Sequence, residues 1–218
     1  MVQADTHGMK IYVATSNAGK LADFRQAATM MDVVLEPLPG LSTLAAPEEY
    51  SDSFEGNARI KAIYYSGFAP DSLVLADDSG LEVDALAGGP GVRSARFAQD
   101  VGWVDTGLGA DRNNNDALLV AMTEAVDRTA RYRCALALAR YGRVSHVSFG
   151  AVDGVLLDEP TGAGGFGFDP LFYVPELGCA MAEATPEQRL QVSHRGRAMR
   201  SLLAMLSSEC TIIDNLCR

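Results

Sequence analysis

The chain has 218 residues, 48% hydrophobic and 21% charged, and its 18 basic and 28 acidic side chains give a formal net charge of −10. This composition excludes a disordered or fibrous chain, and the length suffices for one large domain or two small ones. No run rich in Lys and Arg is present, which argues against a surface for a nucleic-acid polymer or an anionic membrane. Only Lys10, Lys20 and Lys61 are lysines, so a lysine that binds phosphate has few possible positions.

The cysteines and histidines show no metal-binding or redox spacing. We expect the four cysteines to be reduced thiols. Residues 1–8 lack the basic start and apolar run of a signal peptide, and no segment reaches the ~18 apolar residues of a membrane span. We therefore expect a cytoplasmic protein with no membrane partner and a flexible N-terminal extension over residues 1–9.

Strand and helix patterns alternate along the first half of the chain. The apolar spacing predicts a strand over 11–15, a helix beginning near Lys20, a short strand over 33–35, a Pro-rich loop over 37–52, a helix over 53–66 and a strand over 73–76. After that strand, Asp77-Asp78-Ser79-Gly80 predicts a turn, and the glycine-rich segment to Gly91 predicts irregular structure.

The second half predicts a loop, a hairpin and a last helix. The expected elements are a loop over 102–115, a helix over 116–126, a hairpin of strands 131–139 and 144–152, a flexible loop over 161–170, a strand over 171–174 and a helix over 196–208. Strands alternating with helices, together with a hairpin, indicate an α/β protein with a mixed sheet. We expect a single domain over 10–209, followed by a C-terminal tail over 210–218.

A polar turn at the start of the first helix is a candidate phosphate site. Residues 15–20 place hydroxyl groups, a glycine and Lys20 where a helix N-terminus offers free N–H groups and a positive dipole end. Ala14 and Leu21 show that the turn is no Walker A loop. The alternative is that Ser16 or Asn17 only caps the helix while Lys20 is solvated.

Two adjacent carboxylates, Asp77 and Asp78, follow an apolar strand. Ligands of open α/β sheets bind beyond strand ends, and carboxylates beside phosphates are typical of Mg²⁺ sites. The alternative is a turn in which these side chains bond to the backbone.

Two further groups of polar residues are weaker candidates. Asn57 and Lys61 are four residues apart on one helix face, with Glu55 near the helix start; Glu55 alternatively only compensates the helix dipole. His194 and Arg195, with Arg189 upstream, form the last group, although such a pair is more often found on a surface.

Taken together, these motifs resemble the Ham1/ITPase family of nucleoside-triphosphate pyrophosphatases. The matching segments are Ala14-Thr-Ser-Asn-Ala-Gly-Lys20, Phe54-Glu-Gly-Asn-Ala-Arg-Ile-Lys-Ala62, Ala76-Asp-Asp-Ser-Gly-Leu81, Gly89-Pro-Gly-Val-Arg-Ser-Ala-Arg96, Gly164-Gly-Phe-Gly-Phe-Asp-Pro170 and Ser193-His-Arg-Gly196. They follow the family's order over nearly the whole chain. The resemblance implies an elongated, twisted mixed sheet flanked by helices, with two lobes, and a homodimer.

The resemblance also implies roles for individual residues. Asp78 would ligate Mg²⁺ and activate the attacking water, and Glu55 would be a second metal ligand. The implied substrate-binding residues are Thr15, Ser16, Asn17, Ala18, Gly19, Lys20, Asn57, Lys61, Ser79, Phe166, Gly167, Phe168, Asp169, Arg189, His194 and Arg195.

The chain departs from the family pattern at two positions. The family usually has Glu directly before the residue that corresponds to Asn57, where this chain has Gly56; its acid, Glu55, is turned by about 100° around the helix. Arg189 stands where relatives often carry Lys, which keeps the charge and changes the hydrogen-bond geometry.

The implied reaction is hydrolysis of ITP, dITP or XTP to the monophosphate and pyrophosphate. Donors from His194, Arg195 or backbone N–H groups that face the purine 6-carbonyl would reject adenine, whose 6-amino group is itself a donor. Guanine carries the same carbonyl, so its exclusion needs a further element near the 2-position. Three alternatives are a phosphatase that releases single phosphates, a nucleotide-binding module without catalysis and a purely structural protein.

Overall fold

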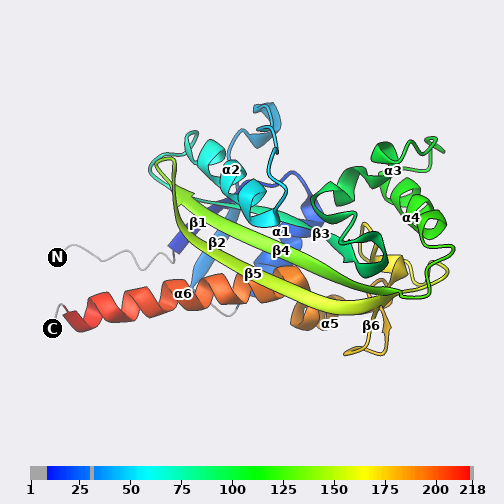
Figure 1. Ribbon diagram of the computed structural model, residues 1–218. Helices are drawn as coiled ribbons and strands as arrows, with labels where there is room; N and C mark the ends of the chain where they lie inside the picture. Colours follow the sequence, from blue (N-terminus) through cyan, green and yellow to red (C-terminus); the bar gives the residue numbers. More distant parts are fainter. Residues whose placement is uncertain (1–8, 30–31, 217–218) are drawn as a thin grey trace.

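The computed structural model describes residues 9–29 and 32–216 and shows a seven-stranded mixed sheet flanked by helices (Figure 1). The strands are β1 (Met9–Val13), β2 (Val33–Pro37), β3 (Leu73–Val83), β4 (Thr129–Arg140), β5 (Arg143–Leu156), β6 (Phe172–Val174) and β7 (Cys179–Ala180). Their order in the sheet is β2-β1-β3-β4-β5-β6-β7. β1 is parallel to β2 and β3, whereas the pairs from β3 to β7 are antiparallel. The expected mixed sheet is confirmed.

Helices cover both faces of this sheet. They are α1 (Ala18–Ala28), α2 (Phe54–Ser66), α3 (Phe97–Asp100), α4 (Ala110–Ala121), α5 (Pro186–Val192) and α6 (His194–Leu216), with short 3₁₀ turns at Leu41–Thr43, Asp84–Leu86, Gly91–Arg96 and Asp169–Leu171. In Figure 1, α2 lies on one side of the long strands and α6 runs along the other. None of the helices in the described part of the chain is long and apolar enough to cross a membrane.

Alternating side chains on β3 and β4 form two cores, one on each face of the sheet. Leu75 and Leu136 pack with the buried residues of α1 and α6, such as Phe24 and Leu202. The opposite face carries small residues, and Ala58, Ala62 and Tyr65 of α2 pack against them; the small sheet residues are Ala76, Ala135, Ala137 and Ala139. Because side chains of a strand alternate between faces, one apolar run serves both helix layers.

A third core lies farther along the same long strands. Leu81 of β3 and Tyr132 of β4 pack there with Leu118 of α4 and Phe172 of β6. The strands β3, β4 and β5 therefore connect this core to the two cores beneath α2 and α6.

The predicted turn at Asp77–Gly80 is wrong. β3 runs on through these residues to Val83, because β4 pairs with it at each position from Val74 to Val83. Asp and Gly have low strand propensity, and this long antiparallel pairing overrides it. The irregular structure expected over 81–91 therefore begins only after Val83.

Three predicted boundaries also change. The helix expected over 116–126 is α4, which begins already at Ala110 and ends at Ala121. The last helix begins at His194 and continues to Leu216, so most of the expected tail over 210–218 has helical backbone. Met9 belongs to β1, and the rest of the expected extension, residues 1–8, lies outside the described residues.

Candidate functional site

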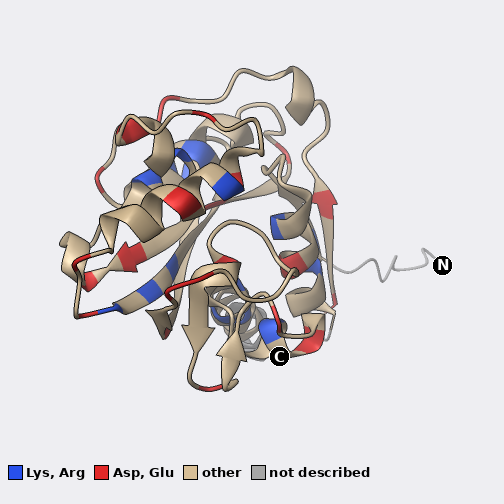
Figure 2. Ribbon diagram, turned by 90° about the vertical axis from the view of Figure 1, so that its right-hand side faces the viewer, with Lys and Arg blue, Asp and Glu red and all other residues tan. Residues whose placement is uncertain are grey.

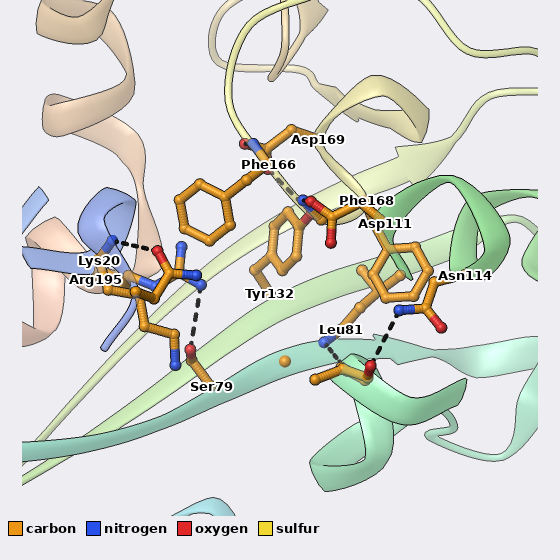
Figure 3. A pocket seen from close by; sticks show the side chains of 15 residues that line it. Lys20, Ser79, Leu81, Asp111, Asn114, Tyr132, Phe166, Phe168, Asp169 and Arg195 are labelled. Carbon is orange, nitrogen blue, oxygen red and sulfur yellow. Dashed lines mark hydrogen bonds between the residues drawn. The ribbon is translucent and has the colours of Figure 1, made fainter. Parts of the chain in front are cut away.

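Two adjoining hollows lie between the cores of the sheet. The first, called here the Lys20 hollow, has a volume of about 130 Å³ and is lined by Asn17, Lys20, Ser79 and Tyr132 among others. The second, the His194 hollow, has a volume of about 200 Å³; its lining residues include Gly19, Asp23, Met181, Arg189, Ser193 and His194. Phe166, Asp169 and Arg195 line both hollows. Figure 3 shows Lys20, Ser79 and Arg195 on one side of the first hollow and Asp111 and Asn114 on the other.

The turn before α1 holds Lys20 by a cap and an ion pair. Asn17 Oδ1 accepts a hydrogen bond from the Lys20 backbone N–H at 3.0 Å and caps the helix. Lys20 Nζ lies 2.8 Å from Asp77 Oδ2, so this lysine is paired rather than solvated. A Cβ on Gly19 would lie 2.7 Å from the Phe166 ring, so glycine allows the two segments to approach. Thr15 is half-buried, and Ser16 and Ala18 are exposed.

Asp77 and Asp78 point to opposite faces of β3. Asp77 bonds to Lys20 and accepts a hydrogen bond from Ser79 Oγ at 3.2 Å. Asp78 Oδ1 lies 2.8 Å from Lys61 Nζ, which α2 supplies from the other face. The strand geometry, with its two-residue period, imposes this separation. Each carboxylate therefore has its own lysine.

The two environments shift the acidities of these carboxylates in opposite directions. Burial would raise the pKa of Asp77, but the charges of Lys20, Lys61 and Arg195 outweigh it and lower that pKa. Burial raises the pKa of Asp78, and Lys61 offsets this only in part. Burial would lower the pKa of Lys61, whereas Asp77 and Asp78 raise it. Such divergent pairs are typical of sites that divide acid–base roles between carboxylates.

Asn57 is a support for Asp78 and not a lining residue of either hollow. The residue is 1% exposed. Its amide bonds to the backbone of Ser51 in both directions, at 3.0 Å each, and its Nδ2 lies 3.4 Å from Asp78 Oδ2. Asn57 therefore orients Asp78, and its predicted contact with substrate stays a prediction.

The expected metal ligand Glu55 is turned toward solvent. It pairs with Arg59 at 2.7 Å, both side chains being exposed by more than 40%. The acid beside Asp78 is instead Glu49, whose Oε2 lies 3.6 Å from Lys61 Nζ. A Cβ on Gly56 would overlap Ser51 Oγ, so the turn before α2 leaves no room for an acid at that position. Glu49 therefore replaces Glu55 as the candidate second ligand.

Arg195 joins the two hollows. Its guanidinium lies over the Phe166 ring, 4.6 Å from the ring centroid, and donates a hydrogen bond from Nη2 to Ser79 Oγ at 3.2 Å. Nη1 lies 3.6 Å from Asp23 Oδ2. Phe166 and Arg195 thus form a cation–π contact, and both residues line the two hollows.

Three residues that line the His194 hollow carry buried nitrogens without hydrogen-bond partners. These nitrogens are Arg189 Nη1, Arg195 Nε and both ring nitrogens of His194. His194 stacks on Tyr132, with ring centroids 4.6 Å apart. Burial, with the charges of Arg195 and Lys20, holds the pKa of His194 well below its ordinary value. A neutral imidazole offers one donor and one acceptor. Buried polar groups cost free energy until they are paired, so this hollow is suited to a polar ligand.

Asp169 shapes the loop that carries Phe166. It accepts hydrogen bonds from the Phe166 N–H at 3.1 Å and from the Tyr132 hydroxyl at 3.1 Å. Burial raises the pKa of Asp169 to about 6, although these donors and Arg195 oppose the shift. Phe168 is 4% exposed and packs mainly in the third core. The loop is therefore built on buried contacts.

Sequence reasoning did not identify several residues of the site. Tyr132 lies within a strand pattern, and Asp111 and Asn114 lie in a segment expected to be an exposed loop. Asp23 lies in the predicted first helix, where an exposed acid is ordinary. A signal was present only in the three consecutive asparagines 113–115, which are unusual for a solvated loop and are all buried.

The fold and the site define an α/β protein with a preformed pocket lined by polar and charged side chains. Residues 11–205 match the sequence profile of the Ham1 family. A dITP/XTP pyrophosphatase of Acidobacterium capsulatum is 52% identical over 199 residues, which cover 91% of this chain and 98% of the relative. One of Desulforamulus reducens is 42% identical, covering 91% and 96%.

Solved structures agree with these matches. The Ham1 protein of Staphylococcus aureus superposes with a TM-score of 0.77 at 36% identity, covering 92% of this chain and 99% of that one. A HAM1 protein from Coxiella burnetii gives 0.78 at 30% identity, with the same coverage. The chain belongs to the Ham1 family.

Proposed function

We propose that this protein hydrolyses dITP, XTP and ITP to the nucleoside monophosphate and pyrophosphate, with Mg²⁺ as cofactor. The observation that carries the proposal is that the Lys20 hollow and the His194 hollow adjoin each other. Lys20 lies at a helix start that lines one hollow, and the neighbouring hollow is lined by Arg189, His194 and Arg195, which carry buried nitrogens without hydrogen-bond partners. The relatives named dITP/XTP pyrophosphatase and the membership of the Ham1 family support the same activity.

The phosphate end of the substrate is assigned to the start of α1 and to the two lysines. Free N–H groups at a helix start and a lysine side chain both favour phosphate oxygens. Lys20 and Lys61 are each held by a carboxylate before substrate binds. A triphosphate would share them with Asp77 and Asp78.

The donor set suits Mg²⁺. No group of three acidic, His or Cys side chains forms a metal cage in the part of the chain that the structure describes. Mg²⁺ does not require one, because it commonly binds one or two carboxylates and takes its other ligands from water and phosphate. Asp78 and Glu49 both approach Lys61 and would hold the ion. When bound, the ion would neutralise charge that develops on the phosphate oxygens.

Asp78 is assigned the role of general base. Its raised pKa makes it a stronger base than Asp77, and Asn57 and Lys61 fix its orientation. A water molecule attacks the α-phosphorus and gives its proton to the Asp78 carboxylate. The bond between the α-phosphorus and the bridging oxygen breaks, and pyrophosphate leaves with that oxygen. Lys20 and Lys61 offset the growing negative charge.

Selection of the base is assigned to the His194 hollow. Arg189 and Arg195 supply donors for a 6-carbonyl, as in hypoxanthine and xanthine. Adenine would place its amino donor against them and leave buried groups unpaired, which costs roughly 1–3 kcal/mol for each group.

A panel of nucleotides tests the proposal. Pyrophosphate release is measured for dITP, XTP, ITP, dATP and dGTP, with and without Mg²⁺, for the wild type and for Asp78→Asn. We expect release from the first three in the presence of Mg²⁺ and little from the variant. Orthophosphate released without added pyrophosphatase would identify a phosphatase instead. Tight binding of ITP without turnover would identify a binding module.

The remaining partner assignments stay predictions. Basic and acidic positions are intermixed over the ribbon in Figure 2, and a nucleic-acid polymer would need concentrated positive charge, so we assign a single nucleotide as ligand. The homodimer implied by the family is tested by light scattering during gel filtration. The cytoplasmic location is tested by fractionating cells.

A further inference from the structure

We infer that Asp111 and Asn115 of α4 are positioning residues for purine recognition, because they hold the peptide groups of Gly167 and thereby set Phe166 against Arg195. The inference rests on the proposed function, since it assigns the loop over 162–169 to the base. It concerns residues that lie outside the motifs by which the sequence indicated a site.

Both backbone groups of one glycine are bound by one helix face. The Gly167 N–H donates to Asp111 Oδ2 at 2.8 Å, and Asn115 Nδ2 donates to the Gly167 carbonyl at 2.9 Å. Asp111 and Asn115 are four residues apart, so they lie above one another on α4. Asn115 Nδ2 also donates to the Asp111 carbonyl at 2.8 Å, which aligns its amide with the loop.

Gly167 is the position where the loop needs external support. Its φ of +65° belongs to the region that favours glycine, and nothing lies within 4 Å of a Cβ placed there. Conformation, and not lack of room, therefore demands glycine. Its neighbours face different surroundings, since Phe166 contacts Arg195 at the hollow and Phe168 is buried in the third core. A rotation at Gly167 would move the Phe166 ring relative to that anchor.

α4 is a firm support for this contact. Leu118 and Ala117 are 0% and 2% exposed in the third core. Asn114 ties the helix to the preceding segment, accepting from the Ala98 N–H at 2.8 Å and donating to the Ala95 carbonyl at 3.2 Å. Asp111 lies in the first turn of the helix, where the dipole favours a carboxylate and a charged acceptor strengthens the bond.

Three single variants test the inference. Asp111→Ala removes the acceptor for Gly167, and Asp111→Asn keeps an oxygen at that position. Asp116→Ala is the matched control, because Asp116 lies on the same helix and pairs with Arg112. We expect Asp111→Ala to raise KM for dITP and XTP about tenfold with little change in kcat, the effect of one lost charge-assisted hydrogen bond. Asp116→Ala should stay within about twofold of the wild type, and Asp111→Asn, which keeps an acceptor oxygen but loses the charge, should lie between the wild type and Asp111→Ala.

Two further measurements separate positioning from general damage. Inhibition by inorganic tripolyphosphate, which has no base, should be unchanged in Asp111→Ala. Hydrogen exchange of the peptide over 162–169 should be faster in Asp111→Ala than in the wild type and unchanged in Asp116→Ala. Because Asp111 is exposed, we expect all three variants to fold.

Several outcomes would overturn the inference. An unchanged KM or unchanged exchange in Asp111→Ala would show that the contact does not position the loop. Equal losses in Asp111→Ala and Asp111→Asn would show that an acceptor oxygen at this position does not hold the loop. If the wild type released no pyrophosphate from any nucleotide, the proposed function would fail, whereas the exchange result would still decide whether Asp111 holds Gly167.

Discussion

The phosphate end and the base end of the site satisfy their polar groups in different ways. Lys20 and Lys61 are each paired with a carboxylate at 2.8 Å. In the His194 hollow, by contrast, buried nitrogens of Arg189, His194 and Arg195 have no partner. The phosphate end is thus stabilised by internal ion pairs that a ligand must share. At the base end, the burial of these nitrogens without hydrogen bonds costs free energy, and a ligand with complementary polar groups would reduce that cost.

This difference predicts how each end responds to substitution. Changes at the phosphate end should reduce both catalysis and stability, because they separate ion pairs. Changes at the base end should reduce recognition and leave stability equal or higher.

The largest effect is expected for Asp78→Asn. An amide cannot accept the proton of the attacking water, so kcat for dITP should fall by about 10²–10⁴. Pyrophosphate release under saturating substrate measures it. Glu55→Gln is the control and should retain activity, because Glu55 pairs only with exposed Arg59. Full activity of Asp78→Asn would remove Asp78 from its assigned role.

Lys20→Ala should follow, with effects on both binding and folding. KM for dITP should rise roughly 10–100-fold, as for a lost charge-assisted contact with phosphate. The variant also leaves Asp77 buried without its lysine, which should cost about 3 kcal/mol in the free energy of unfolding. Urea unfolding and initial rates measure the two effects. Lys10→Ala, which opens an exposed pair with Glu36, should change neither; a normal KM in Lys20→Ala would refute the phosphate contact.

His194→Phe should separate recognition from stability. A phenyl ring can keep the stacking on Tyr132 but removes two buried unpaired nitrogens. The free energy of unfolding should rise by about 1 kcal/mol, and kcat/KM for XTP should fall about tenfold. The free energy of unfolding, from urea unfolding, and kcat/KM for XTP, from initial rates, are measured on the same preparation of the variant. A less stable variant with normal kcat/KM would reverse the contrast between the two ends.

Asp169 should give the smallest effect, a pH dependence of stability. Its folded pKa of about 6 exceeds its ordinary value of 3.8, so the native state holds a proton that the unfolded chain has released. The contribution is fully present below pH 3.8 and is lost as pH rises to about 6. Relative to Asp169→Asn, the wild type should therefore lose stability between pH 4.5 and 6.5 in urea titrations. A constant difference across this range would show that the Asp169 pKa is not raised.

Local patterns were sufficient for much of the fold. The apolar spacing predicted a helix over 53–66, which the structure confirms as α2, Phe54–Ser66. The hairpin of β4 and β5 was predicted for the same reason, since Tyr141-Gly142 separates two alternating runs. These elements depend on contacts between near neighbours in the chain.

Predictions from local patterns were wrong where contacts between distant parts of the chain decide the structure. The sequence around Asp77 and Asp78 predicted a turn. These residues instead belong to a strand, because β4, which lies more than 50 residues later in the chain, pairs with them. The N-terminal half of α4 was predicted as a loop because the polar side chains of Asn114 and Asn115 are buried against other loops instead of facing water. Hydrophobic periodicity within a short window of sequence indicates neither pairing with a distant strand nor burial of polar side chains.

The sequence by itself determined which chemical groups the protein has for a site: two of its three lysines, adjacent carboxylates, and the segment of Ser193 to Gly196, all in the order of one family. Only the tertiary structure decided how they are used. Strand pairing turns Asp77 and Asp78 to opposite faces, Ser51 excludes an acid at position 56 and so leaves Glu49 beside Lys61, and α4 binds Gly167. These outcomes depend on which distant segments pack together, and packing is a property of the whole chain rather than of any local pattern.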